Sequence, residues 1–211
     1  PDQDSLETWI SLTYAATYTR RIEFGPLVAP TTFRHPALTA RMAAQVDDLS
    51  GGRLVLGLGA GWHEREHRQF GIPFYDFPTR YAMLQDALEV TTRLFHSDTP
   101  VSYDGPHFPL AEAILLPRPQ RPGGPPILIG GNGLKKTLPL VARYADEWNA
   151  VYLTPDGCRE RNRLLDELLA QAGRGPGDVK RSLMTQMVFG RDDAQVKAKL
   201  EKFPEPSEKL L

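Results

Sequence analysis

The stretch LGLGAGWHEREH, from Leu56 to His67, contains two groups of residues whose types and spacing suit different chemistries. Its second half, which begins at His63, matches the zinc-protease pattern H-E-x-x-H, in which two histidines bind the metal and the glutamate acts as a base. Its first half is an apolar run with glycines at positions 57, 59 and 61, and such a strand end lets a ligand approach the backbone. The stretch is therefore either a metal-binding helix or the end of a strand beside a cofactor.

Zinc binding is disfavoured by the residues around the two histidines. Both side chains must lie on one face of a formed helix, yet the residues just ahead of His63 are glycines, an alanine and a tryptophan, which favour a loop. One conceivable third ligand, Glu89, belongs to a separate predicted helix. The sequence therefore predicts no metal site.

A dinucleotide-binding fingerprint is excluded by Trp62, which occupies the position of its third glycine. The glycines then permit either a close approach to a ligand or close packing of helix and strand. The later stretch ILIGGNG repeats the arrangement, with Gly130 and Gly131 between an apolar strand and a helix start. Free N–H groups at a helix start favour phosphate or another anion. Lys135 and Lys136 either add positive charge there or are simply solvated.

The composition is ordinary for a soluble globular protein: 41% of the 211 residues are hydrophobic, 24% are charged, and the formal net charge is −1. Nothing in this balance indicates a nucleic-acid or membrane partner. No apolar run approaches the ~20 residues of a membrane span, and no basic-then-apolar leader opens the chain. The single cysteine, Cys158, excludes an intramolecular disulfide and fits the reducing cytoplasm. We therefore expect a cytoplasmic protein.

The spacing of apolar residues predicts strands and helices in alternation. The predicted strands cover residues 22–28, 53–59, 126–131, 147–153 and 181–190. The predicted helices include one capped by Asp4 or Ser5, one from Pro36 to Leu49 that ends at a left-handed Gly51 or Gly52, and others over 79–95, 134–144, around 164–169, and from 192. Residues 100–110 are predicted to form a hairpin or ordered loop. The Pro/Gly-rich residues 117–126 are predicted to form a loop, with an interdomain linker as the alternative.

Several of these strands are apolar on consecutive positions, which is typical of a parallel sheet covered on both faces. Alternation of strand and helix indicates right-handed crossovers. Two architectures fit this pattern: an open doubly wound sheet and a (β/α)₈ barrel of roughly 250 residues. The pattern alone leaves both open, because about five strands are visible.

Three longer stretches contain the motifs described above: RIEFGPLVAPTTFRHPALTARMAA, LSGGRLVLGLGAGWHEREHRQFGIPF and PPILIGGNGLKKTLPLVARYADEWN. Together they resemble the bacterial luciferase-like monooxygenase family, most closely its branch that uses the deazaflavin coenzyme F420, from Leu6 to about Lys202. The resemblance implies an α/β fold of the (β/α)₈ TIM-barrel type, usually dimeric, with the flavin or deazaflavin ring at the carboxyl ends of the strands. The visible strands would be the third to the seventh. Residues 1–211 would then form a single partial barrel domain that lacks the N-terminal strands and the last strand.

The resemblance also implies which residues contact the cofactor. The family has a bulge with a non-proline cis peptide behind the cofactor ring, a loop lining the cofactor and substrate pocket, and a turn that receives the cofactor's side chain or phosphate. The bulge is matched by Leu27 and Val28. The loop is matched by Gly59, Ala60, Gly61 and Trp62, and the turn by Gly130, Gly131 and Asn132.

The catalytic residues are less directly implied. Some deazaflavin dehydrogenases of the family hold a catalytic glutamate where this chain has Trp62, a departure that argues against dehydrogenation of a sugar phosphate. His63 and Glu64 are the neighbouring candidates for acid–base catalysis, and the alternative is that both are solvated side chains without a catalytic role. The family's usual histidine and aspartate would lie upstream of Pro1.

The predicted function is hydride transfer between coenzyme F420 and a small organic substrate, by a protein that binds, orients and shields the cofactor. An FMN-dependent monooxygenase on the same fold is the nearest alternative. A non-catalytic dimerising barrel fragment is the second alternative, and a zinc hydrolase is the third. We expect a homodimer whose partner is a small-molecule substrate, without nucleic-acid or membrane binding.

Overall fold

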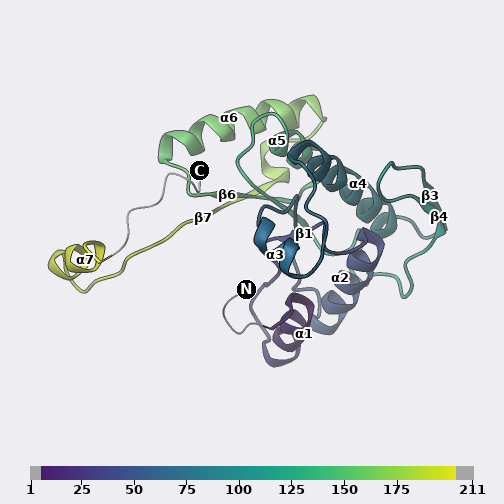
Figure 1. The fold of residues 1–211 in the computed structure, drawn as a ribbon, viewed down its shortest axis with the longest axis horizontal. Coiled ribbons are helices and arrows are strands. Elements are labelled where there is room, and N and C mark those ends of the chain that lie inside the picture. The colour runs from purple at the N-terminus through teal and green to yellow at the C-terminus, as the bar shows by residue number, and fades with distance from the viewer. Residues whose placement is uncertain (1–5, 203–211) are drawn as a thin grey trace.

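The computed structural model describes residues 6–202, which form a sheet of five parallel strands flanked by helices (Figure 1). The strands are β1 (Ala29–Pro30), β2 (Leu56–Gly59), β5 (Ile127–Gly130), β6 (Glu147–Val151) and β7 (Lys180–Met184). They pair in the order β1-β2-β5-β6-β7, which is their order along the chain. Within the described residues β1 and β7 are edges, so the sheet does not close on itself.

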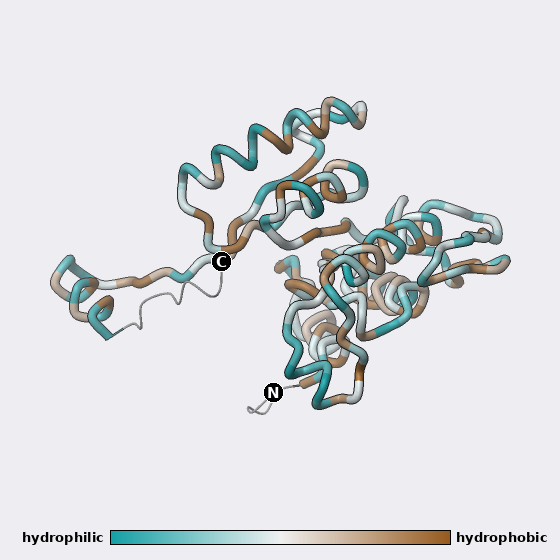
Figure 2. The backbone as a smooth tube through the Cα atoms, turned by 45° about the horizontal axis from the view of Figure 1, so that its top comes forward, coloured by the Kyte–Doolittle hydropathy of each residue, from teal (hydrophilic) through white to brown (hydrophobic). Residues whose placement is uncertain are grey.

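Five of the helices pack side by side in chain order along the sheet. The helices are α1 (Thr8–Tyr18), α2 (Pro36–Ser50), α3 (Glu64–Gln69), α4 (Phe77–His96), α5 (Thr137–Tyr144), α6 (Pro155–Gln171), α7 (Asp193–Leu200) and the short 3₁₀ helix η1 (Pro176–Asp178). Among the five, contacts run from α1 to α2, then to α4, α5 and α6. Along α6 hydrophobic and hydrophilic residues alternate (Figure 2), and the buried ones include Leu165 and Leu169. No helix within residues 6–202 is both long and apolar enough to cross a membrane.

The two faces of the sheet carry different residues, because successive side chains of a strand point to opposite sides. Leu58, Ile129 and Trp148 are almost completely buried in the hydrophobic core. On the other face the register places Gly57 beside Leu128, and Gly130 beside Asn149. The small and polar residues of the strands therefore gather on one face.

The predicted strand over residues 22–28 is wrong in its bounds. Phe24 makes one isolated bridge to Leu54, and regular pairing begins only at Ala29. Between them the chain bulges at Leu27 and Val28, so these residues lie outside the β ladder. The bulge is the reason why a continuous apolar run did not give a continuous strand.

The predicted cap of α1 is not tested directly, because Asp4 and Ser5 lie outside the described residues. The residue that caps α1 is Glu7, whose carboxylate accepts hydrogen bonds from the backbone N–H groups of Trp9 (2.7 Å) and Ile10 (3.2 Å). Helix α2 begins at Pro36 and is followed by a left-handed Gly51 with φ of 69°, both as predicted. The other predicted helices and strands agree with the structure within a few residues, apart from β7, whereas α3 and η1 were not predicted.

The predicted hairpin is confirmed as β3 (Val101–Tyr103) paired with β4 (Leu110–Ala113). It is held on α4 by the Tyr103 hydroxyl, which donates to Asp86 at 2.8 Å. Burial, together with this hydrogen bond, raises the pKa of Tyr103 to about 12, so the phenol remains a donor at neutral pH. The Pro/Gly-rich residues 117–126 form a loop bound to α2 through Arg121, and this attachment favours the loop over the linker.

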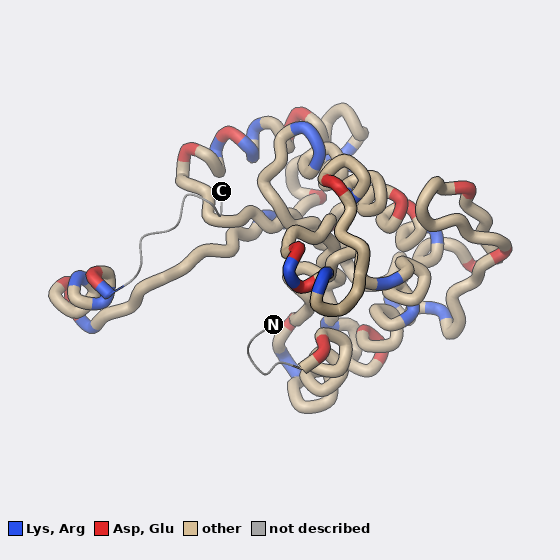
Figure 3. The backbone as a smooth tube through the Cα atoms, in the orientation of Figure 1, with Lys and Arg blue, Asp and Glu red and all other residues tan. Residues whose placement is uncertain are grey.

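Strand β7 ends at Met184, well before residue 190 where the sequence predicted its end. Its partner β6 ends at Val151, so the following residues have no strand to pair with on that side. The chain continues as an extended segment to α7, which stands apart from the rest of the molecule (Figure 1). Helix α7 has no buried residue and carries charges of both signs (Figure 3).

Candidate active site

The bulge of Leu27 and Val28, directly before β1, lies beside the carboxyl ends of β2 and β5. The peptide bond between these two residues is cis, as the family resemblance implied. The Val28 side chain lies against the glycines of both neighbouring strands. A methyl group on Gly59 would come within 2.5 Å of Val28 Cγ2, and one on Gly130 within 3.2 Å of Cγ1. Since Leu27 is 54% exposed beside it, the bulge forms a partly exposed apolar ledge.

Gly59 and Gly130 make room for the side chain of a neighbouring residue. The sequence allowed either close approach of a ligand or close packing, and at Gly59 and Gly130 the Val28 side chain occupies the space that a Cβ would need. Both glycines therefore allow the bulge to pack closely on β2 and β5. The bulge in turn offers a surface on which a flat ligand can lie. Direct contact of either glycine with a cofactor stays a prediction.

After β2 the chain turns outward at Gly61, which has a positive φ of 79° that favours glycine. Its carbonyl accepts a hydrogen bond from Arg80 of α4. Ala60 is half-buried, and Trp62 is 75% exposed, with its ring tilted against that of His63 at a centroid distance of 5.0 Å. The turn therefore places a large aromatic side chain in solvent beside the strand end.

The turn after β5 is built by hydrogen bonds to β6. The Gly131 N–H donates to the Asn149 carbonyl at 3.0 Å, and the Gly131 carbonyl accepts from the Trp148 indole at 2.8 Å. The Asn132 amide donates to the Val151 carbonyl at 2.7 Å and accepts from the Val151 N–H at 2.9 Å. The Asn132 side chain thus braces the turn internally, so any contact with a cofactor would come from the position of the turn.

The H-E-x-x-H residues do not form the arrangement that zinc requires. His63 is the residue before α3, and Glu64 is exposed. His67 is 1% exposed, and both its ring nitrogens are engaged: Nδ1 lies 2.9 Å from the His63 carbonyl oxygen and Nε2 lies 2.7 Å from Thr32 Oγ1. Because His67 holds the loop together, it is not available to a metal. Over residues 6–202 no group of three or more histidine, cysteine, aspartate or glutamate residues is placed to hold one.

The two candidate acid–base residues differ in their surroundings. The His63 side chain is 34% exposed, and its Nδ1 lies 3.9 Å from a carboxylate oxygen of Glu66. Glu64 begins α3, where its negative charge is stabilised by the helix dipole. His63 is the one in ring contact with Trp62. Their catalytic roles stay predictions.

Sequence reasoning missed a row of polar side chains on the same face of β6 and β7. Asn149, 5% exposed, donates to Ser182 Oγ at 2.9 Å, and the Ser182 hydroxyl donates to Glu147 at 2.6 Å. Asn149 lies beside Gly130 in the register. The available signal was the stretch EWNAV, in which polar residues occupy alternate positions of an otherwise apolar strand.

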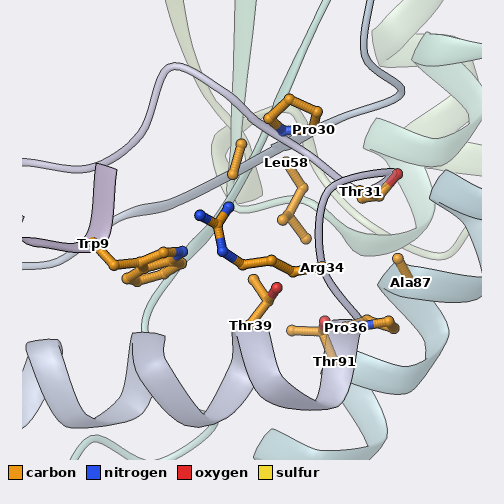
Figure 4. A pocket seen from close by; sticks show the side chains of 10 residues that line it. Trp9, Pro30, Thr31, Arg34, Pro36, Thr39, Leu58, Ala87 and Thr91 are labelled. Atoms are coloured by element: carbon orange, nitrogen blue, oxygen red, sulfur yellow. The ribbon is translucent and has the colours of Figure 1, made fainter. Parts of the chain in front are cut away.

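Two cavities of the described residues are not lined by the ledge residues Leu27 and Val28. One, of about 10 Å³, lies between the sheet and helices α1, α2 and α4. Figure 4 shows the Arg34 side chain extended across it toward the Trp9 indole. That volume is roughly the room for one water, so the cavity is too small for an organic substrate. The other is a groove between α1 and α2 on the outside of the molecule.

Comparison with known proteins agrees with this geometry. A family model described as luciferase-like monooxygenase matches residues 1–208. An uncharacterised Mycobacterium tuberculosis protein, Rv0953c, is 33% identical over 171 residues, which cover 81% of this chain and 58% of that protein. The F420-dependent glucose-6-phosphate dehydrogenase of Amycolatopsis mediterranei is 29% identical over 185 residues, which cover 84% and 53%. The chain thus spans a little more than half the length of these relatives.

Among solved structures, a riboflavin lyase with modified FMN and riboflavin superposes with a TM-score of 0.83 at 18% identity, covering 95% of this chain and 49% of that one. At this identity the likeness concerns the fold, and it makes the five-stranded sheet part of a luciferase-like TIM barrel. The chain belongs to the luciferase-like monooxygenase family.

Proposed function

We propose that this chain is part of an oxidoreductase that transfers a hydride between coenzyme F420 and a small organic substrate. The observation that carries the proposal is the ledge of Leu27 and Val28 at the carboxyl ends of the strands, where active sites of (β/α)₈ barrels lie. A flat apolar support suits a planar ring. The F420-dependent relative from Amycolatopsis adds support for this cofactor.

Two parts of the chain would hold the cofactor. The ledge would support the ring. The turn at Gly131 and Asn132 leads to the start of α5, where backbone N–H groups suit a phosphate, and the exposed Lys135 and Lys136 stand at this start. When bound, F420 supplies the hydride acceptor or donor at C5, and the protein supplies binding and orientation.

The substrate would lie on the side of Trp62 and His63. We assign to His63 the uptake or delivery of the substrate proton, because its imidazole is partly exposed and lies in ring contact with Trp62, and histidine is the side chain most often used for proton transfer. Glu64, one residue further and exposed, is the second candidate for this role.

A parallel titration of the full-length protein with F420 and with FMN, followed by cofactor fluorescence, tests the proposal. We expect saturable micromolar or tighter binding of F420 and weaker binding of FMN. Two-electron reduction should then proceed without oxygen consumption, since a deazaflavin does not pass its electrons to oxygen.

A charge on the ledge provides the control for where the cofactor binds. Leu27→Glu is expected to weaken binding at least about tenfold, because a carboxylate would have to be desolvated under the ring. Leu116→Glu introduces the same charge at a leucine that is equally exposed, at 54%, but precedes β5 at the opposite end of the strands. Equal effects of the two changes would contradict binding on the ledge.

An FMN-dependent monooxygenase is the second candidate, favoured by the FMN-bound neighbour. Preference for FMN in the titration, with oxygen uptake during turnover, would select it. Binding of neither cofactor by the folded protein would leave a non-catalytic scaffold and remove the enzyme proposal.

We also propose that two copies associate through the outer groove between α1 and α2, which has a volume of about 620 Å³. Its lining carries no formally charged residue and consists of Trp9, Ile10, Thr13, Tyr14, Thr17, Met42, Gln45, Val46 and Leu49. Ile10, Tyr14 and Leu49 are each more than half exposed, so apolar side chains protrude beside the groove. An apolar face without charges can pack against the same face of a second copy, as a two-fold interface between identical chains requires.

The double change Ile10→Arg and Tyr14→Arg is expected to convert the dimer of the full-length protein to a monomer, because four like charges would meet across the interface. Light scattering after size exclusion measures the mass. Leu116→Arg, on a different part of the surface, serves as the control and should leave the mass unchanged. A monomeric wild type, or a doubly substituted protein that remains dimeric, would refute this interface.

A further inference from the structure

We propose that His67 and Arg80 latch the loop of residues 61–76, called the α3 loop below, in the position that presents Trp62 to a flat, uncharged substrate. The inference rests on the proposed function, because the α3 loop leaves β2 at the strand end where the cofactor would lie. It gives the second histidine of the H-E-x-x-H motif a positioning role. It also gives Trp62 the role of a contact surface for the substrate.

The first half of the latch is a hydrogen bond between two loops. His67 Nδ1 lies 2.9 Å from the His63 carbonyl oxygen, which can only accept, so Nδ1 carries the proton. In the neutral imidazole Nε2 is then an acceptor, and the Thr32 hydroxyl donates to it at 2.7 Å. Thr32 belongs to the connection between β1 and α2, so this bond ties the α3 loop to the segment that follows the ledge.

Aromatic rings enclose the His67 imidazole. Phe33, next to Thr32, and Phe74, near the end of the α3 loop, both meet it edge-on, with centroid distances of 4.7 and 4.9 Å. With 1% of its surface exposed, His67 is shielded from water that would compete for its hydrogen bonds. The hydrogen bond to Thr32 is therefore protected and directional.

The second half of the latch is Arg80, which joins the two ends of the α3 loop. Its guanidinium donates to the Gly61 carbonyl at the start of the loop and, through Nε at 2.9 Å, to the Tyr75 carbonyl near the end. It also lies 4.2 Å from the centre of the Phe74 ring. Arg80 is in the first turn of α4, so a regular helix fixes where this side chain begins.

The cap of α4 keeps that first turn in place. The Asp76 carboxylate accepts from the Thr79 N–H at 2.9 Å. Hydrogen bonding from Thr79, with a smaller contribution from the charge of Arg80, lowers the pKa of Asp76, so the cap is ionised at neutral pH. The latch is thus anchored on α4, which follows the loop, and on the segment after β1, which contacts the loop through Thr32.

The latch holds the loop in a position in which the Trp62 side chain is exposed. Trp9 and Trp148 are 6% and 2% exposed, whereas Trp62 is 75% exposed. Its only ring neighbour in the described chain within stacking distance is His63. An indole held in solvent next to a strand end offers a broad apolar face to a planar ligand. This chemistry favours an aromatic alcohol or carbonyl compound over a sugar phosphate.

The matched pair Thr32→Val and Thr32→Ser in the full-length protein tests the latch. Valine keeps the shape but removes the hydroxyl, whereas serine keeps the hydroxyl. With F420 and benzyl alcohol as the probe, we expect Thr32→Val to raise KM about tenfold, because Trp62 moves. The value of kcat should fall as well, because His63 belongs to the same loop and its carbonyl is bonded to His67. Thr32→Ser should restore most of the loss, and the Kd for F420 should be alike in both variants. Equal KM values, or a change confined to cofactor affinity, would overturn the latch.

Substrate preference tests the role of Trp62. Wild type should turn over benzyl alcohol with a higher kcat/KM than glucose 6-phosphate, and Trp62→Ala should lower kcat/KM for benzyl alcohol at least about tenfold. The hydride of the alcohol carbon would pass to F420 and the hydroxyl proton to the protein, which leaves benzaldehyde. Preference for glucose 6-phosphate, or no turnover of benzyl alcohol by an F420-binding protein, would overturn the assigned substrate class.

Trp62 fluorescence separates failure of the latch from failure of the proposed function, because it needs no cofactor. Acrylamide should quench wild-type emission strongly, Trp62→Phe should remove most of the quenchable part, and Thr32→Val should change the quenching constant while Thr32→Ser does not. If the protein binds neither F420 nor FMN, the proposed function fails while this measurement still judges the latch. Unquenched emission in the full-length wild type would overturn the exposure of Trp62.

Discussion

Gly57→Ala is expected to lower the free energy of unfolding by about 3 kcal/mol or more, at the upper end of what overpacking costs. The added methyl group would lie 2.0 Å from the Pro26 carbonyl oxygen and 3.1 Å from Val28 Cγ1. A backbone oxygen cannot rotate away as a side chain does. Gly57 is fully buried in the middle of β2 and fixed beside Leu128 of β5, so neither strand can shift to make room.

Urea unfolding of the full-length protein measures this effect, with Gly177→Ala as the matched control. A methyl group on Gly177 would meet nothing within 4 Å, and its φ is not in the left-handed region, so the control should stay within about 0.5 kcal/mol of wild type. Gly57→Ala should also weaken cofactor binding, because the bulge rests on this position. Similar stabilities for the two variants would show that the bulge is not packed on β2 in the way described.

The expected effect at Gly57 illustrates what the sequence can and cannot reveal about this site. Glycines at alternate positions of an apolar strand are visible in the sequence, and they correctly marked the end of β2 as unusual. The sequence does not reveal that the space above them is filled by Val28, a residue about thirty positions earlier. That contact depends on the pairing of β1 with β2, which no local pattern specifies.

The H-E-x-x-H stretch also shows that a sequence motif does not reveal the tertiary contacts of its residues. Its spacing is real, and α3 does begin directly after His63. The decisive facts are the partners of His67, namely the His63 carbonyl one turn back and the hydroxyl of Thr32, 35 residues earlier. A motif records residue types at fixed offsets, whereas a ligand role depends on which ring nitrogens remain free, and this depends on tertiary contacts.

Element order and strand direction were predictable, because long periodic helices and consecutive apolar strands carry strong signals. The ends of the elements were less predictable where a neighbour decides them. The chain stops pairing at Met184 because β6 stops at Val151, and helix α1 is capped by Glu7, a residue whose type is not among the preferred capping residues. In both cases the deciding contact lies outside the local pattern.

Asp47→Asn is expected to lower the free energy of unfolding by about 3 kcal/mol, the low end of the range for breaking a buried ion pair. The Asp47 side chain is 1% exposed, and its two oxygens accept from Arg121 at 2.7 and 2.6 Å in a paired, two-bond contact. The same carboxylate accepts from the Leu54 N–H at 3.0 Å. An asparagine amide would turn an N–H₂ group toward the guanidinium, so one bond would be replaced by two facing donors.

Asp98→Asn is the matched control, because the Asp98 side chain is 89% exposed and its contact with Arg118 should contribute less than about 1 kcal/mol. A double-mutant cycle completes the test. Arg121→Met should cost much less in the Asp47→Asn background than in wild type, because the charge that Arg121 compensates is already gone. Additive effects would mean that the two residues stabilise the fold independently. The coupled result would show that this pair helps to position the loop of residues 117–126 on α2, together with the bond from the Gln120 N–H to Asp48. This loop leads into β5, the strand that places Gly130 beside the ledge.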